Sequence, residues 1–80
     1  MNSEQYIKMQ LDLVEYGELN KIEANDKIVG FLNAENGVTW DSYRAAQREL
    51  VEWEYVSRQK ANNRLHGFRD YIRLNEKEQA

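Results

Sequence analysis

The feature that most constrains the fold is a long stretch without proline, from Thr39 to about Leu74. Apolar or small residues recur along it at steps of three and four, which is the spacing of one face of an α-helix. The residues on this apolar face are Tyr43, Ala46, Leu50, Trp53, Ser57, Ala61, Leu65, Phe68 and Ile72. The pattern predicts one amphipathic helix over residues 40–74, about 50 Å long at 1.5 Å per residue.

A second set of residues follows the same helical spacing, about a quarter-turn from the apolar face. We call it the arginine stripe, and it consists of Arg44, Arg48, Tyr55, Arg58, Asn62, His66, Arg69 and Arg73. Every arginine of the chain lies after position 40. Guanidinium groups suit bidentate contacts with carboxylates and phosphates. We therefore predict that the stripe binds a protein partner or a nucleic acid.

The apolar face of the same helix needs a surface to pack against. We predict that its larger members form the core or a self-association surface, namely Tyr43, Leu50, Trp53, Ala61, Leu65, Phe68 and Ile72.

Two shorter helices are predicted before the long one. Residues 3–16 place apolar and charged side chains on opposite faces, and Asn2 with Gln5 can form a capping box at the start. Residues 21–33 carry a broad apolar face and form the second helix. Gly17 is expected to end or bend the first helix, because glycine destabilises a helix interior by about 1 kcal/mol relative to alanine.

The connection to the long helix has two interpretations. Asn36-Gly37 is a strong β-hairpin signal, and strand-forming residues follow it, so a short hairpin is one alternative. The second strand would be only about three residues long, however, and isolated hairpins are marginal in water. Thr39 is also a good N-cap residue. We favour helix over 21–33 and a turn at Gly37. Gly30 and Gly67 weaken the helices that contain them.

The predicted fold is therefore all-α, as a single domain over residues 1–80, with two short N-terminal helices packed on one long C-terminal amphipathic helix. Residues 75–80 are predicted to form a frayed tail. Eighty residues without cysteine give a small core that no disulfide supplements. The two short helices, about 40 Å together, cannot cover the whole apolar face. We therefore expect a homodimer or a bound partner.

A helix-turn-helix is a weaker hypothesis for residues 32–48. Apolar residues and the turn glycine Gly37 fall near the required places, but Asn33 and Asn36 occupy positions that are usually small or apolar. The presumed second helix would also be far too long.

Catalytic and metal-binding chemistry find little support in the sequence. The chain has one histidine, His66, and no cysteine, and Ser57 lies more than two helical turns away from His66. No glycine-rich phosphate loop and no set of ligands with metal-binding spacing is present in the sequence. We expect no enzymatic activity, no cofactor, no metal and no small-molecule substrate.

The distribution of charge along the chain favours some of the remaining functions over others. The net charge is −3, but residues 1–40 hold three lysines and seven acids, whereas residues 41–80 hold eight basic residues and seven acids. The arginine stripe could simply be neutralised by acids of the first half, as surface pairs worth about 0–1 kcal/mol each. Its clustering instead favours a small interaction protein that binds and modulates, or inhibits, a protein partner. The alternative is a nucleic-acid-binding protein, with RNA or single strands favoured over sequence-specific duplex DNA.

Apolar runs of two or three residues predict no membrane span. The absence of cysteine and of an export signal favours the cytoplasm. Small viral or plasmid accessory proteins have this size and composition, and we predict that the chain is such a protein. If it is viral, its location would be the cytoplasm of the host cell.

Overall fold

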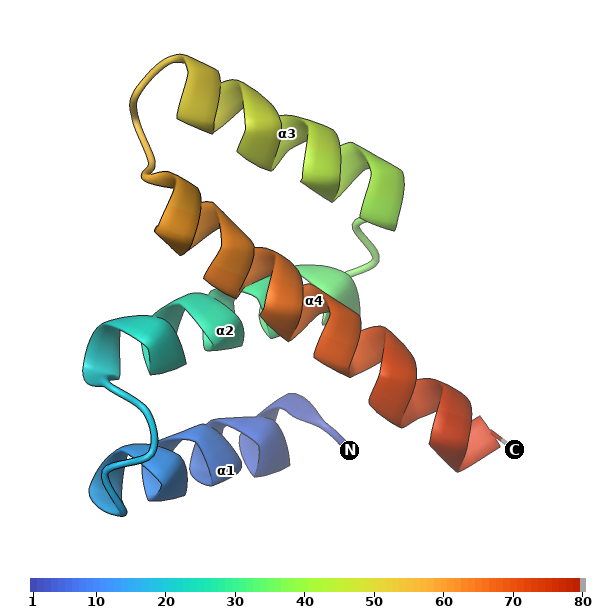
Figure 1. The fold of residues 1–80 in the computed structure, drawn as a ribbon. Helices are drawn as coiled ribbons and strands as arrows, with labels where there is room; N and C mark the ends of the chain where they lie inside the picture. The colour runs from blue at the N-terminus through green and yellow to red at the C-terminus, as the bar shows by residue number, and fades with distance from the viewer. Residues whose placement is uncertain (80) are drawn as a thin grey trace.

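The computed structural model describes the backbone of residues 1–79 and the side chains of residues 1–76. The elements are α1 (Ser3–Glu15), α2 (Lys21–Glu35), α3 (Trp40–Glu52) and α4 (Arg58–Gln79), and the described residues contain no strand (Figure 1). The all-α prediction is confirmed, and residues 36–37 form a turn between two helices instead of a hairpin.

The single helix predicted over residues 40–74 is wrong, because the chain turns sharply after α3. Glu54 adopts a left-handed backbone conformation, with φ of 64°. The N–H of Tyr55 then donates to the carbonyl oxygen of Leu50 at 3.0 Å, and the N–H of Glu54 donates to that of Val51 at 3.1 Å. This pair of hydrogen bonds is the Schellman motif that ends many helices.

The chain becomes helical again after a short connection. The Ser57 hydroxyl accepts a hydrogen bond from the N–H of Lys60 at 3.1 Å, so Ser57 caps the start of α4. Ser57, which was predicted to lie on the apolar face of a single long helix, is therefore the N-cap of α4.

The other helix ends follow the sequence closely. Asn2 and Gln5 form the expected capping box, and the Thr39 hydroxyl accepts from the N–H of Ser42. Gly17 and Gly37 both have positive φ just after α1 and α2. Helix α2 extends to residue 35, two residues beyond its predicted end. Helix α4 includes residues 75–79, which were predicted to fray, and residue 80 lies outside the described residues.

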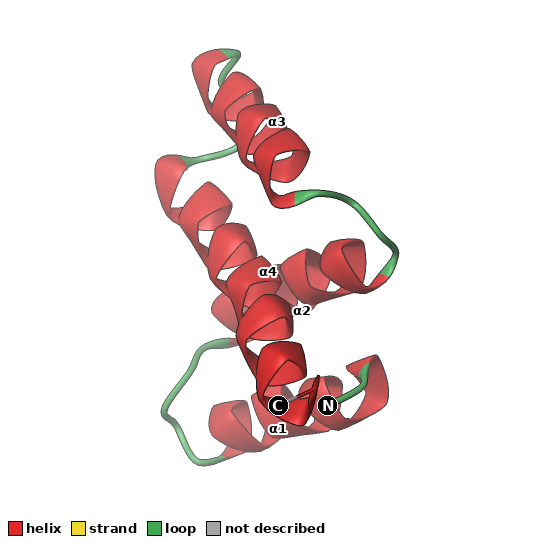
Figure 2. Cartoon of the chain, turned by 90° about the vertical axis from the view of Figure 1, so that its right-hand side faces the viewer, coloured by secondary structure: helices red, strands yellow, loops and turns green. Residues whose placement is uncertain are grey.

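Helices α2 and α4 cross at the centre of the molecule, α1 packs on α2, and α3 lies beside the first half of α4 (Figures 1 and 2). A Cβ atom on Gly30 would overlap the backbone carbonyl of Arg64, and one on Gly67 would overlap that of Lys27. The backbones of the two helices are therefore in direct contact. The two glycines that weaken the helices locally are what allows them to pack this closely.

Aromatic rings fill the space on the α1 side of the crossing. Tyr6 stacks on Phe31 with ring centroids 4.0 Å apart, and Tyr71 meets Phe31 edge-on at 5.3 Å. The Tyr6 hydroxyl donates to a carboxylate oxygen of Asp70 at 2.7 Å. Burial and this hydrogen bond raise the pKa of Tyr6 far above its ordinary value. These contacts fix α1 on α2 and α4 together.

A second aromatic group joins α3 to α4. Phe68 stacks on Tyr43 at 4.9 Å and meets Trp40 at 5.6 Å, with Ala34 of α2 in the same cluster. The helix-turn-helix hypothesis would require α2 and α3 to pack on one another, whereas each packs mainly on α4.

Candidate binding groove

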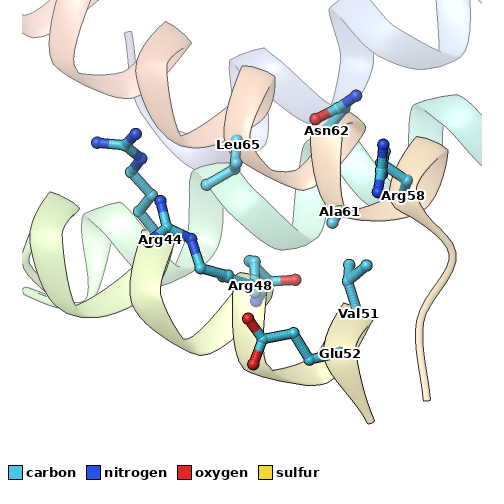
Figure 3. A pocket seen from close by; sticks show the side chains of 9 residues that line it. Arg44, Arg48, Val51, Glu52, Arg58, Ala61, Asn62 and Leu65 are labelled. Carbon is cyan, nitrogen blue, oxygen red and sulfur yellow. The ribbon is translucent and has the colours of Figure 1, made fainter. Parts of the chain in front are cut away.

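A groove lies between the second half of α3 and the first half of α4 (Figure 3). Its volume is about 330 Å³. The residues that line it are Arg44, Gln47, Arg48, Val51, Glu52, Arg58, Ala61, Asn62 and Leu65. Because the turn at residues 53–57 folds α4 back beside α3, stripe residues from the two helices lie around one concave surface instead of along one rod.

The groove combines a cationic rim with an apolar floor. Figure 3 shows Arg44 at one end and Arg58 beside Asn62 at the other. The apolar side chains of Val51, Ala61 and Leu65 lie between the two ends.

Within residues 1–76, the three arginines of the groove are not held in ion pairs, although Asp41 lines an adjoining depression with Arg44 and Arg48. Among residues with described side chains, Arg44, Arg48 and Arg58 form no ion pair and no hydrogen bond through the guanidinium. Glu52 is the only acid in the lining, so three arginines and one glutamate give a local charge of +2 in a chain of net charge −3. Neutralisation by acids of the first half of the same chain does not account for these three arginines. A concave, cationic surface attracts anionic groups.

The remaining members of the arginine stripe are placed differently. Arg69 lies over the Trp40 ring at 5.0 Å, a cation–π contact between α3 and α4. Arg73 donates to Asp70 at 3.0 Å, and so joins the network that holds Tyr6. His66 lines, with Asn62 and Arg69, a smaller depression that continues along α4. The stripe is thus divided: Arg44, Arg48, Arg58 and Asn62 line the groove, Arg69 and Arg73 contact Trp40 and Asp70 respectively, and Tyr55 and His66 lie outside both groups.

Two large aromatic side chains stand in solvent beside the groove. Trp53 is 62% exposed and Tyr55 is 74% exposed, with ring centroids 6.3 Å apart. They belong to the connection between α3 and α4, next to the end that Glu52 and Arg58 line. Trp53 is therefore not a core residue of this chain, because the turn carries it away from the apolar face.

The other residues predicted for the apolar face range from buried to exposed. Tyr43, Ala61 and Phe68 are buried, Leu50, Leu65 and Ile72 are half-buried, and Ala46 and Ser57 are exposed.

Polar side chains that the sequence analysis did not single out connect α3 to α4 at the groove. Gln47 is 4% exposed, and its side-chain oxygen accepts from Arg64 at 3.2 Å. Gln47 lies one turn after Tyr43 and three residues before Leu50, so the periodicity of the apolar face could have identified it. Gln47 was not predicted to be buried because only apolar or small residues were assigned to that face.

A buried carboxylate lies in the same region. Asp26 of α2 is 1% exposed, and the Lys60 ammonium is 4.0 Å from one of its oxygens. Burial raises the pKa of Tyr43; the Arg64 charge lowers it and the Asp26 charge raises it further. Charges on α2 and α4 therefore influence the Tyr43 hydroxyl of α3.

Among the described residues, no group of three or more histidine, cysteine, aspartate or glutamate side chains could hold a metal ion. Within the same residues, no helix combines the length and apolar character needed to cross a bilayer. The chain matches no family model, no curated protein and no solved structure in the comparisons made with them.

Proposed function

We propose that this chain is a small non-enzymatic interaction protein that binds an acidic surface of a protein partner in the α3/α4 groove and thereby modulates or inhibits that partner. The observation that carries the proposal is the set of three arginines, Arg44, Arg48 and Arg58, that surround an apolar floor without an ion-pair partner of their own among residues 1–76. Unpaired guanidinium groups beside apolar surface suit a partner that presents both carboxylates and apolar side chains.

The exposed aromatic pair supports a protein partner. Tryptophan, tyrosine and arginine supply a disproportionate share of binding energy in protein interfaces. Trp53 and Tyr55 stand beside the groove with most of their surface in water, so a partner that covers them would remove apolar surface from solvent. The floor residues Val51 and Leu65 would gain in the same way.

A capture experiment with matched variants tests the proposal. Arg44→Glu with Arg48→Glu reverses charge in the groove, and Lys8→Glu with Lys21→Glu makes the same change of charge on α1 and α2. Wild type and the lysine variant should retain the same dominant polypeptide from a lysate of the source or host cell, after nuclease treatment, and the arginine variant should lose it. Equal capture by both variants, or loss of the polypeptide on nuclease treatment, contradicts the proposal.

Nucleic-acid binding is the second candidate, and the position of the aromatic pair is the observation that favours it. Trp53 and Tyr55 belong to the connection that leads into Arg58, so their rings could stack on bases while the arginine binds phosphate. Each Arg→Ala change that removes an interaction with a phosphate should lower the slope of log affinity against log salt by about 0.7–0.9. A fluorescent single-stranded oligonucleotide that does not bind at low salt rules this candidate out.

Self-association stays a prediction of its own. A homodimer would have a mass of about 19 kDa, twice the chain mass of 9.5 kDa, and light scattering separates the two.

A further inference from the structure

We infer that the occupant of the α3/α4 groove is an acidic amphipathic α-helix of the partner protein, with its apolar side chains on the floor and its carboxylates toward the arginines. This inference rests on the proposed function and specifies the partner's chemistry and conformation.

Charge selects the polar side chains of the occupant. Arg44 and Arg48 lie one helical turn apart on α3, and Arg58 approaches from α4 at the far end (Figure 3). An occupant that lies along the groove therefore passes guanidinium groups at both ends. Carboxylates near both ends of the occupant would pair with them, and the local charge of +2 disfavours a basic or neutral segment.

The floor selects apolar side chains between those carboxylates. Val51, Ala61 and Leu65 present aliphatic surface from both walls, and Ala61 is too small to fill the space above it. An apolar side chain of the occupant placed there would be covered on two sides. The required pattern is thus apolar residues in the middle of one face and acidic residues at its edges.

The backbone of the walls selects a helix. Both walls are α-helices, and their backbone groups are bonded within the helices except at the ends. An extended peptide in such a groove would find no strand edge to pair with, so its buried N–H and C=O groups would lose hydrogen bonds. A helix satisfies its own backbone and presents side chains at i, i+3, i+4 and i+7 to the groove. Three to four turns would match α3, which has 13 residues and is about 20 Å long.

The exposed aromatic pair would extend the contact at one end. Glu52 and Arg58 line the end of the groove past which a bound helix would leave. Trp53 and Tyr55 are exposed residues of the connection that joins these two residues. Their rings would then cover an apolar residue at the end of that helix.

Selection from a random peptide library tests the inference. Peptides of about 16 residues, or roughly four helical turns, are selected on the full-length chain and counter-selected on the Arg44→Glu/Arg48→Glu variant. Selected peptides should carry apolar residues at helical spacing, flanked by Asp or Glu. Affinity is then measured by fluorescence anisotropy of a labelled selected peptide. It should fall about tenfold or more with Arg58→Glu, and as strongly with a central proline in the peptide, since proline breaks the helix.

The controls separate the inference from the proposed function. The Lys8→Glu/Lys21→Glu variant should bind the selected peptide within about twofold of wild type, since these lysines lie outside the groove. Peptides that need the arginines but tolerate proline, or that lack acidic residues, overturn the acidic helix and leave the proposed function standing. If the binding of peptides and of captured proteins is independent of the arginines, both the inference and the proposed function are wrong. Light scattering tests whether a second copy of the chain occupies the groove. If wild type and the lysine variant are dimers and the arginine variant is a monomer, the groove binds a second copy and the inference is wrong.

Discussion

The two helix contacts made by α4 differ in kind. At its crossing with α2, the backbones touch through Gly30 and Gly67, and the contact admits no added atom. Beside α3, the same helix is separated from its neighbour by a groove, with aromatic packing at one end and a hydrogen bond from Arg64 to the groove residue Gln47. The first contact is closed where the two glycines meet, although it also includes the Lys60–Asp26 ion pair, whereas the second leaves an open groove.

The difference assigns separate roles to the two halves of the molecule. A crossing without space for a Cβ has one geometry, because protein interiors are packed densely and adapt poorly to added volume. Under the proposed function, the unpaired guanidinium groups that border the groove make their contacts with the partner. We therefore expect substitutions at the crossing to change stability and substitutions in the groove to change binding.

The largest expected effect is at the crossing. Gly30→Ala or Gly67→Ala should destabilise the fold by about 3 kcal/mol or more, because the added methyl group must push two backbones apart. This loss exceeds the gain of about 1 kcal/mol that alanine brings to a helix. Urea denaturation followed by circular dichroism measures the change.

Gly17→Ala is the matched control for the crossing. The Cβ at Gly17 meets no atom within 4 Å, but φ of +77° is unfavourable for alanine. The expected loss is therefore about 1 kcal/mol. An equal loss at Gly17 and Gly67 would show that the crossing is looser than described.

A smaller effect is expected where α1 meets α4. Tyr6→Phe removes the hydroxyl that donates to Asp70, and should cost about 2 kcal/mol at neutral pH, the range for hydrogen bonds to charged groups. Asp70 retains its contact with Arg73. Denaturation of wild type and variant at the same pH gives the difference.

The same tyrosine predicts a loss of stability in alkaline solution. The pKa of Tyr6 is raised in the folded state, so its contribution is complete below the ordinary tyrosine pKa of about 10 and decreases as the pH rises above it. The decrease is about 1.4 kcal/mol per pH unit for one proton. Tyr6→Phe should make the pH dependence between 9 and 11 shallower than that of wild type; identical slopes would contradict the assignment.

The turn between α3 and α4 should accept a stabilising change. Glu54 holds a left-handed conformation at φ of 64°, which costs a non-glycine residue roughly 1 kcal/mol. Glu54→Gly should therefore leave the fold unchanged and raise the free energy of unfolding by up to about 1 kcal/mol. Clear destabilisation would mean that the turn is not formed as described.

The smallest effect on stability is expected in the groove. Arg44→Ala and Arg48→Ala should each change stability by less than about 0.5 kcal/mol, since neither guanidinium has a partner among residues 1–76. A loss of more than about 1 kcal/mol in either variant would show that the arginine holds the fold.

Local signals in the sequence predicted the parts of the fold that depend on neighbouring residues. Asn2 with Gln5, Gly17 and Gly37 are chemical markers of helix ends, and they lie where the helices begin and end. The end of α3 carries no such marker, because Glu54 occupies the left-handed position that glycine usually fills. Uninterrupted periodicity through residues 53–57 therefore predicted a helix that does not exist.

The crossing and the groove depend on residues distant in sequence. In the sequence, Gly30 and Gly67 each appear only to weaken a helix. Their role in the close contact between α2 and α4 is visible only in the folded structure. The arginine stripe was identified from spacing, yet its division into groove residues and packing residues follows from the turn. Trp53 is a second example. It is exposed because the chain turns at residues 53–57, and no residue nearby predicted that turn.

Native-state hydrogen exchange tests the contrast between the two contacts most directly. Amides of α2 and α4 near Phe31 and Phe68 should exchange only through global unfolding, at the full free energy of unfolding. Amides in the second half of α3, from Arg48 to Glu52, should exchange through a smaller opening at lower free energy. Equal protection across α3, the turn and α4 would contradict the account, since it would describe one continuous, uniformly packed rod.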